Sequence, residues 1–470
     1  MKVIIIGAGM AGLSAAAHLE QNGITDFLVL EARSQIGGRF LVQKHGEHSL
    51  HMGAQWVHGI HPRNSMFQLA KKYGILNEEM ERDGYGDMDY QSFDIEHMYT
   101  QNREKIPEKF TKMAGKIHTH ICSKLQQKFD ENDDKDNMSI EDFFQTEAKC
   151  EMEKLKPDLT ENEYKMVENS LYGCFRNILI GYTGDEIKNC HSYFFGSAEE
   201  LPGGDLILPQ KILDIFPKEI PSLDKNLKLN VQVEKIFWNE KEIKIRTKNG
   251  EIFTCDFCIC TFPPGVIQKS HETLFDPKLP QSKIEAYNSI CPGAVSKYFI
   301  EWDEKWRDKN DHPFMFAWSK NDIEEMKLPK DWIKGVFEIS VEDPLGTLMM
   351  VWVVGDAARA ADDLDDETIK RDIGNLMRIF IDPKVPDPDH LYRHCWTKDE
   401  FALGAYSAPS LKCTKETFKV TGTPLPNDAN PRLMFAGEAT HPNFWSFMHG
   451  ARESGIREAQ RILNLNAQNK

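Results

Sequence analysis

The opening of the chain contains the feature that most limits what it can fold into. An apolar run at Val3–Ile6 passes into a glycine-rich turn, an alanine-rich stretch over residues 11–21 and a second apolar run at Phe27–Leu30. Short apolar runs of this kind predict buried parallel strands, and the stretch between them has the length and composition of a helix. Gly23 stands where a left-handed helix terminator is expected. The opening therefore predicts a strand–helix–strand (βαβ) unit that ends at an acid, Glu31.

Three glycines between the first strand and the helix have the spacing of a dinucleotide-binding turn. Gly7 permits the tight turn, Gly9 lets the backbone approach a pyrophosphate, and Gly12 lets the helix pack against the strand. The N-terminus of the helix would then face the phosphates, and Glu31 would accept hydrogen bonds from ribose hydroxyls. These residues predict a nucleotide site, but NAD and FAD both remain open from them.

The residues after Glu31 point to FAD. The segment EARSQIGGRF resembles the second motif of the FAD-dependent amine oxidases, the family of monoamine and polyamine oxidases. The resemblance implies that Arg33, Gly38 and Arg39 lie at the phosphates and ribityl chain of the flavin. Two glycines allow close backbone approach, and a guanidinium can hold a phosphate through two parallel hydrogen bonds.

Further segments carry the same resemblance along most of the chain. MGAQWVHG (52–59) resembles the segment against the flavin ring, and NVQVEKI resembles the strand that contacts the adenine. LPGGDLILPQKIL (201–213) resembles the re-entry into the FAD domain, and LMFAGEATHPNFWSFMHGARESGIREAQ resembles the closing flavin segment. The resemblance implies FAD contacts from Gly7, Gly9, Met10, Ala11, Gly12, Glu31, Ala32, Arg33, Gly38, Arg39, Gly53, Ala54, Gln55, Trp56, Val233, Gly437, Glu438, Phe447 and Met448.

The same comparison implies residues for catalysis and substrate binding. Lys297, on an apolar strand where a lysine is costly to bury without a partner, matches the family lysine that holds a water near the reactive flavin nitrogen. Tyr406 and Phe447 match an aromatic cage that would attract an amine, and His58 matches a histidine of animal polyamine oxidases that could hydrogen-bond to the amine or take its proton. Ala405 stands where monoamine oxidases carry a flavin-linked cysteine, which implies non-covalent FAD.

The order of the segments predicts an α/β fold in which a Rossmann-like FAD-binding domain is interleaved with an α+β substrate-binding domain. The FAD domain is expected in three parts, and the substrate domain as a helical part and a sheet part. In chain order the five segments are 1–77 (FAD), 78–200 (substrate, helical), 201–290 (FAD), 291–405 (substrate, sheet) and 406–470 (FAD).

Local patterns add detail within these segments. Ser139 and Thr160 are expected helix starts in the helical part, and a hairpin turn at Asn249–Gly250 predicts a three-stranded meander that closes with residues 251–262. Cys255, Cys258 and Cys260 in that last strand allow a zinc site, but a second Cys/His pair at zinc spacing does not follow. We therefore expect a buried strand and no metal.

The net charge and the lack of long apolar stretches limit the classes of partner that this chain is expected to bind. The net charge of -16 argues against nucleic-acid binding, because a dense basic surface is not available. No stretch approaches the roughly 20 apolar residues of a membrane span, and the opening residues do not resemble a signal peptide. We expect a cytoplasmic monomer or homodimer whose partners are a small amine and molecular oxygen.

The expected function is oxidation of a polyamine, spermine or an N1-acetylated polyamine, since the resemblance is closest to animal spermine and N1-acetylpolyamine oxidases. Hydride transfer to the flavin would give a shorter amine, an aldehyde and hydrogen peroxide. Two alternatives stay open: an oxidase of another amine, such as a monoamine or an amino acid, and a flavin-containing binding protein with little turnover.

Overall fold

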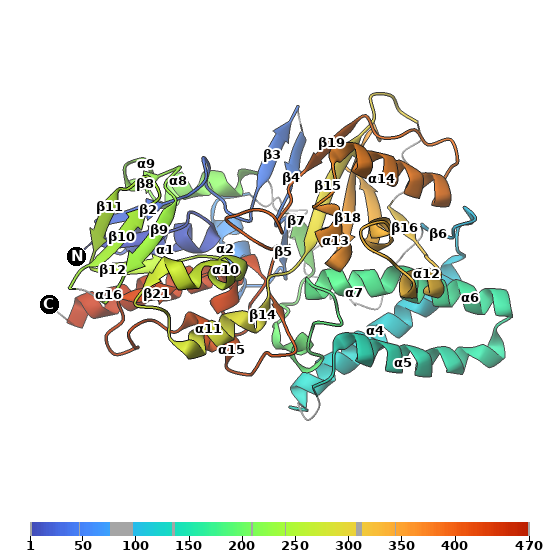
Figure 1. Ribbon diagram of the computed structural model, residues 1–470, viewed down its shortest axis with the longest axis horizontal. Coiled ribbons are helices and arrows are strands. Elements are labelled where there is room, and N and C mark those ends of the chain that lie inside the picture. Colours follow the sequence, from blue (N-terminus) through green and yellow to red (C-terminus); the bar gives the residue numbers. More distant parts are fainter. Residues whose placement is uncertain are drawn as a thin grey trace.

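The computed structural model describes residues 2–46, 48–75, 97–133, 137–207, 210–239, 241–306, 313–343 and 345–468. Figure 1 shows two lobes side by side. The first lobe contains both chain ends and a parallel sheet, and the second contains a six-stranded sheet and the helices of the middle of the chain. This mixed α/β arrangement with a parallel βαβ unit confirms the predicted fold class.

The first lobe is built on a five-stranded parallel sheet whose strands come from the beginning, middle and end of the chain. Its order is β21 (Leu433–Phe435), β12 (Phe257–Cys260), β1 (Val3–Ile6), β2 (Phe27–Leu30) and β8 (Leu227–Lys228). Helix α1 (Met10–Gln21) connects β1 to β2 and packs on the C-terminal helix α16 (Met448–Gln468). A Cβ on Gly455 of α16 would lie 2.0 Å from the Ala11 carbonyl oxygen, so a glycine is what lets the two helices approach so closely.

The predicted meander is present, but its last strand is divided. Strands β9 (Val233–Phe237), β10 (Ile243–Thr247) and β11 (Ile252–Cys255) form an antiparallel sheet that β13 (Phe275–Asp276) extends. The expectation of one continuous strand over 251–262 was wrong. Asp256 accepts a hydrogen bond from the Lys2 amide at 2.8 Å, and after it the chain joins the parallel sheet as β12. The three cysteines of this region are buried, as expected for strand residues.

The second lobe contains a mixed parallel and antiparallel sheet. The helices of residues 355–380 pack on one face, and the helices of residues 108–183 pack on the other. Its order is β19 (His390–Arg393), β15 (Val295–Glu301), β18 (Leu348–Val354), β17 (Val336–Val341), β16 (Phe314–Phe316) and β6 (Met98–Tyr99). Helices α13 (Gly355–Ala361) and α14 (Asp366–Phe380) pack with one face of the sheet into an apolar core.

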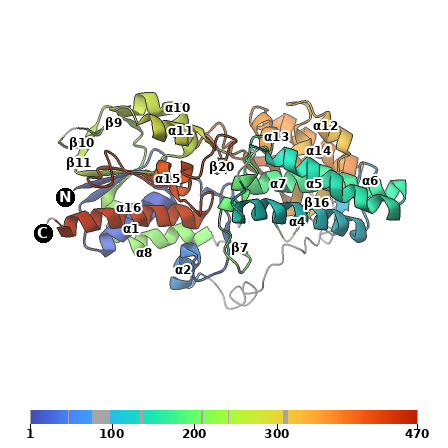
Figure 2. The same ribbon diagram turned by 90° about the horizontal axis from the view of Figure 1, so that it is seen from below.

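The helical region covers the other face of this sheet, and Figure 2 shows its helices together on the second lobe. The helices are α4 (Glu108–Asp130), α5 (Ile140–Leu155), α6 (Glu161–Ser170) and α7 (Arg176–Thr183). Both predicted helix starts are confirmed: the Ser139 side chain accepts from the Asp142 amide at 3.0 Å, and Thr160 forms a capping box with Glu163. A π-helical turn at Leu171–Phe175 joins α6 to α7, and such turns are frequent at functional sites.

Short elements complete the structure. They are β3 (Val42–His45), β4 (His48–His51), β5 (Trp56–His58), β7 (Asp205–Ile207), β14 (Ile290–Cys291), β20 (Ala408–Pro409), α2 (Ser65–Lys72), α8 (Phe216–Glu219), α9 (Leu223–Asn226), α10 (Pro264–Leu274), α11 (Gln281–Asn288), α12 (Lys320–Glu324) and α15 (Thr417–Gly422). The expected boundary at residue 78, and residues 208 and 209 of the re-entry segment, lie outside the described residues. Among the helices of the described ranges, none is both long and apolar enough to cross a membrane.

Candidate active site

A cavity of about 1610 Å³ extends from the glycine turn of the first lobe to the sheet of the second. Pockets for a single small ligand typically measure roughly 300–1,000 Å³, so this cavity has room for a cofactor and a substrate together. Every residue named above for cofactor, catalysis or substrate lines it, with the exception of Gly12. The structure thus brings together the opening, middle and closing segments of the chain.

The glycine turn has the geometry that a dinucleotide requires. A Cβ on Gly12 would lie 1.9 Å from the Gly7 carbonyl oxygen, so Gly12 serves the packing of α1 and not the cavity wall. Gly9 lines the cavity, and a Cβ there would meet nothing closer than 3.9 Å. Gly437, which also lines the cavity, has a φ of +130° and no atom within 4 Å of a Cβ position. Open space over bare backbone at both glycines fits a large group that approaches both.

Glu31 fixes the end of β2 to this turn. Its side chain is 5% exposed, and its two carboxylate oxygens accept from the amides of Ala8 at 2.7 Å and Arg33 at 2.8 Å. These bonds hold the carboxylate at the cavity wall, where a ribose of a bound dinucleotide could reach it.

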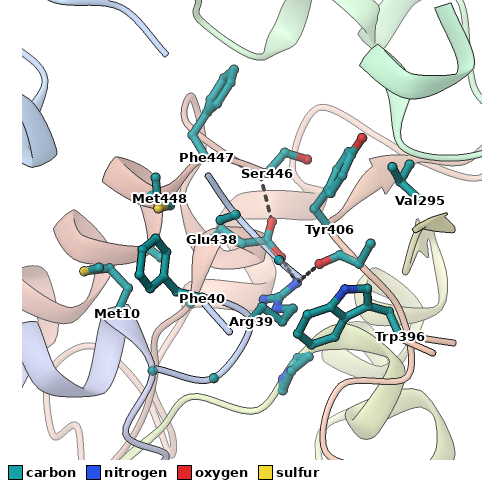
Figure 3. Close-up of a pocket in the computed structure, with 18 of the residues that line it drawn as sticks. Met10, Arg39, Phe40, Val295, Trp396, Tyr406, Glu438, Ser446, Phe447 and Met448 are labelled. Atoms are coloured by element: carbon teal, nitrogen blue, oxygen red, sulfur yellow. Dashed lines mark hydrogen bonds and ion pairs between the residues drawn. The ribbon is translucent and has the colours of Figure 1, made fainter. Parts of the chain in front are cut away.

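Arg39 and Glu438 form an ion pair across the cavity wall (Figure 3). The Arg39 Nη1 donates to Glu438 Oε1 at 2.9 Å and to the Ala405 carbonyl oxygen at 3.0 Å. Glu438 also accepts from the Ser407 hydroxyl at 2.9 Å and from the Ser446 amide at 2.7 Å. Ser446 has a φ of +69°, a strained value for a residue with a side chain, and these bonds hold it there. The network fixes the loop that leads to Phe447.

Arg33 is held by an acid that the sequence did not single out. Its Nη2 lies 2.6 Å from Asp399 Oδ2, and its guanidinium lies over the Phe401 ring. Burial raises the pKa of Asp399, but hydrogen bonds from His394 and Arg33 outweigh burial and lower this pKa to about 2. The carboxylate is therefore charged at any physiological pH. Nothing in the local sequence around Asp399 marks it as a partner of Arg33.

Lys297 lines the cavity and is buried beside aromatic rings. Its side chain is 4% exposed, and its Nζ donates to Gln55 Oε1 at 2.8 Å. The Nζ lies 5.2 Å from the ring centroid of Trp56 and 5.5 Å from that of Trp352. Burial lowers the pKa of Lys297 to about 7, with partial opposition from the charge of Glu342. A lysine in this state can hold or release a proton near neutral pH.

Tyr406 is anchored to the helical region. Its hydroxyl donates to the Gly181 carbonyl oxygen of α7, and a Cβ on Gly184 would lie 2.4 Å from the tyrosine ring. Burial raises the pKa of Tyr406, so the hydroxyl stays protonated. In Figure 3 the rings of Tyr406 and Phe447 project to the same side of the site.

Phe447 lies between two histidines at the rim of the cavity. Its ring stacks on His449 at 5.0 Å and lies 5.4 Å from the ring of His58. The side chain of His58 is 46% exposed, and its Nδ1 lies 2.9 Å from Asp205 Oδ2, the residue opposite it where β5 pairs with β7. Asp205 was not predicted, because the pairing of β5 with β7 joins distant parts of the chain. With 46% of its side chain exposed, His58 lies at an entrance to the cavity, where the cavity opens to solvent.

Three acids on the substrate side of the cavity were not identified from the sequence: Glu200, Asp205 and Glu338. Glu338 lies in the apolar strand sequence VFEISV, where a lone acid is a signal that could have been noticed. Glu200 precedes the LPGG segment, and its position is set by the tertiary structure.

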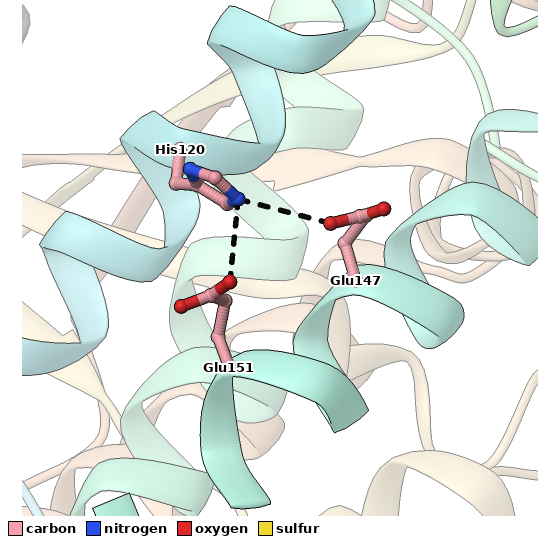
Figure 4. A group of neighbouring side chains, drawn as sticks. All are labelled: His120, Glu147 and Glu151. Atoms are coloured by element: carbon pink, nitrogen blue, oxygen red, sulfur yellow. Dashed lines mark ion pairs between the residues drawn. The ribbon is translucent and has the colours of Figure 1, made fainter. Parts of the chain in front are cut away.

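A second cluster of charged side chains lies outside the cavity, between α4 and α5 (Figure 4). His120, Glu147 and Glu151 place three potential ligand atoms within 4.8 Å of one another. Lys124 lies 2.7 Å from Glu147 and Lys154 lies 2.6 Å from Glu151. The two lysines already neutralise both carboxylates, so the cluster is an ion-pair network that joins the helices.

Comparison with known proteins agrees with this geometry. The chain is 26% identical to the bovine peroxisomal N(1)-acetyl-spermine/spermidine oxidase, over 99% of this chain and 95% of that protein. It is 24% identical to the human protein of the same name, over 99% and 95% of the two chains, and 24% identical to maize polyamine oxidase 1, over 98% and 90%. A family model described as flavin containing amine oxidoreductase matches residues 10–463. The chain therefore belongs to the flavin-containing amine oxidoreductase family, whose members use FAD to oxidise amines.

Proposed function

We propose that this amine oxidoreductase acts on a polyamine, spermine or an N1-acetylated polyamine, with oxygen as the electron acceptor. The observation that carries the proposal is the charge of the substrate side of the cavity, where Glu200, Asp205 and Glu338 accompany the aromatic rings. Carboxylates together with aromatic faces favour a ligand with several positive charges on an apolar chain. The names of the bovine, human and maize relatives support the same substrate class.

The cofactor would be held by the glycine turn, by Glu31 and by the Arg33 and Arg39 region, with Gly437 and Met448 from the closing segment, all of which line the same cavity. When bound, FAD supplies the acceptor for the two electrons of the amine and passes them to oxygen as hydrogen peroxide. Because Ala405 offers no thiol to a flavin, we expect the cofactor to be bound without a covalent link.

The protein's own residues prepare the amine. Tyr406 and Phe447 hold the substrate by their ring faces, and the carbon beside its nitrogen loses a hydride once that nitrogen is neutral. His58, oriented by Asp205 at 2.9 Å, takes a proton from the incoming ammonium at the entrance. Lys297, buried with its Nζ on Gln55, holds water for hydrolysis of the imine to a shorter amine and an aldehyde. A cytoplasmic location and a monomer or homodimer belong to the same proposal.

Incubation of the FAD-loaded protein with spermine, N1-acetylspermine, spermidine and benzylamine, with peroxide as the readout, tests the proposal. Turnover of at least one polyamine with a kcat/KM well above that of benzylamine is expected. Turnover of benzylamine alone would show that the protein oxidises another class of amine, and no flavin reduction by any of the four amines would favour a binding role.

A further inference from the structure

Four side chains form a row across the cavity face of the second-lobe sheet. Lys297 on β15 lies opposite Trp352 on β18, Trp352 lies opposite Glu338 on β17, and Glu338 lies opposite Met315 on β16. Directly opposed residues on neighbouring strands project to the same face of a sheet, and all four line the cavity. The backbone of Glu338 is therefore two interstrand spacings, ~10 Å, from that of Lys297.

A β-bulge is what places Glu338 on this face. The register of β17 against β18 shifts between Val336 and Glu338, so Phe337 is an extra residue. In a regular strand, Glu338 would instead lie opposite Val351, whose side chain packs into the core on the other face. Bulges are over-represented beside active sites, where they redirect a side chain. The irregularity thus turns a carboxylate away from the apolar core and toward the cavity.

The surroundings of Glu338 favour a positively charged neighbour. Burial raises the pKa of its carboxyl to about 7, a hydrogen bond from Ser340 opposes the rise, and the nearby charge of Glu342 adds to it. Within the ranges that the structure describes, no lysine, arginine or histidine forms an ion pair with Glu338. Glu338 is half-buried in the cavity wall, where a desolvated carboxylate without a cationic partner is costly, and a cationic ligand would remove that cost.

Other carboxylates of the cavity already have cationic partners in the protein. The pairs are Glu438 with Arg39 and Glu400 with Lys248, and the Asp205 carboxylate lies 2.9 Å from His58 Nδ1. Glu338 also differs from Asp205 in position, since Asp205 is at the entrance and Glu338 is on the sheet beyond Trp352.

We propose that Glu338 binds a second, distal ammonium of the substrate while the nitrogen that is oxidised lies nearer Lys297. Trp352, between the two, presents its ring to the methylene chain that connects the nitrogens. The proposal rests on the proposed function and narrows it to amines that carry at least two cationic nitrogens, with the distal one selecting the substrate.

The test compares a diamine with the monoamine of the same chain length on the wild type, Glu338→Gln and Glu301→Gln. Glu301 is a matched control, because it is a glutamate of the same sheet that pairs with His45 at 3.0 Å and does not line the cavity. Two quantities are measured without oxygen: the Kd and limiting rate of flavin reduction, and calorimetric binding of each amine to the already reduced enzyme, which cannot oxidise it.

For Glu338→Gln we expect a rise in the Kd of the diamine of about 30-fold or more, the usual result of removing one partner of a desolvated charge pair. The Kd of the monoamine should change less than about threefold. Glu301→Gln should preserve the wild-type preference. If Glu338→Gln fails to retain FAD, Glu338→Asp, which keeps the charge, must preserve a preference for the diamine.

The outcomes separate this inference from the function on which it rests. If the wild type oxidises polyamines but Glu338→Gln keeps the full preference for the diamine, the inference is refuted and the function stands. If the wild type oxidises only monoamines and binds the diamine no better than its monoamine, both are refuted.

Discussion

Replacement of Lys297 by methionine tests whether burial has made this lysine neutral near physiological pH. The pKa of Lys297 falls from 10.5 to about 7, chiefly through burial. At 1.36 kcal/mol for each pKa unit, the protein disfavours the charged form by roughly 5 kcal/mol. Methionine fills a similar volume and removes the charge, at the loss of the 2.8 Å hydrogen bond to Gln55, which is worth about 1–3 kcal/mol when the acceptor is left buried.

The sign of the effect depends on pH. Between pH 7 and 10.5 the unfolded chain keeps the lysine proton and the folded protein releases it, so the stability contributed by this group rises with pH across that window. Below pH 7 both states carry the proton and the folded protein bears the full penalty. We therefore expect Lys297→Met to be more stable than the wild type by roughly 2–4 kcal/mol at pH 6, and less stable at pH 10.

Thermal unfolding of the FAD-loaded proteins, followed by the rise in flavin fluorescence, measures this difference. Lys283→Met is a control, because Lys283 is likewise buried, at 1% exposed, with a pKa lowered to about 7 by burial, yet does not line the cavity. Lys297→Met should also abolish an ionisation near pH 7 in the limiting rate of flavin reduction, and Lys283→Met should retain it. A Lys297→Met variant that is no more stable at pH 6, or that keeps the ionisation, would refute the reasoning.

Three other predictions concern the glycine turn, the ion pair between Arg39 and Glu438, and the link between the protein and its flavin. Gly12→Ala places a Cβ 1.9 Å from the Gly7 carbonyl oxygen and should lower the melting temperature sharply, whereas Gly9→Ala should leave the melting temperature of the apoprotein unchanged and weaken FAD binding in a flavin titration. Glu438→Gln breaks the 2.9 Å ion pair with Arg39 and should destabilise the holoprotein by about 3–5 kcal/mol in denaturant unfolding, as expected when one partner of a buried pair is removed. Acid precipitation should release all the yellow colour into the supernatant, and flavin that stays with the pellet would contradict non-covalent binding.

Features set by neighbouring residues could be predicted from the sequence. The strand, glycine turn and helix of the opening follow from local apolar runs and from glycines. The helix starts at Ser139 and Thr160 follow from the hydroxyls of these two residues, each of which accepts a hydrogen bond from the amide three residues on. Each of these depends on contacts within a few residues. The cofactor and catalytic residues beyond the opening could be named only through a resemblance to a family.

Long-range ion pairs could not be predicted in this way. Arg33 and Asp399 are 366 positions apart, and Arg39 and Glu438 are 399 apart. Motif reading assigned both arginines to the phosphates and ribityl chain of the flavin, but each also has an acidic partner in the protein. The pairs exist because the chain returns to the first lobe at its end, and nothing in the local sequence encodes that return.

A sequence pattern predicts that a segment is a strand more readily than it predicts on which face of the sheet each of its residues lies. In VFEISV a strict alternation would place Glu338 on the same face as Val336, which packs into the apolar core. One extra residue, Phe337, reverses the facing of the acid without changing the composition of the strand. The division of residues 251–262 at Asp256 is similar, since a single residue decides which sheet the following strand joins. Strand register is fixed by the partner strand: β12 joins β1 from a distant part of the chain, and β17 shifts against β18, the strand that follows it. The lone acid of VFEISV can be noticed in the sequence, but the face of the sheet on which it lies is visible only in the folded protein.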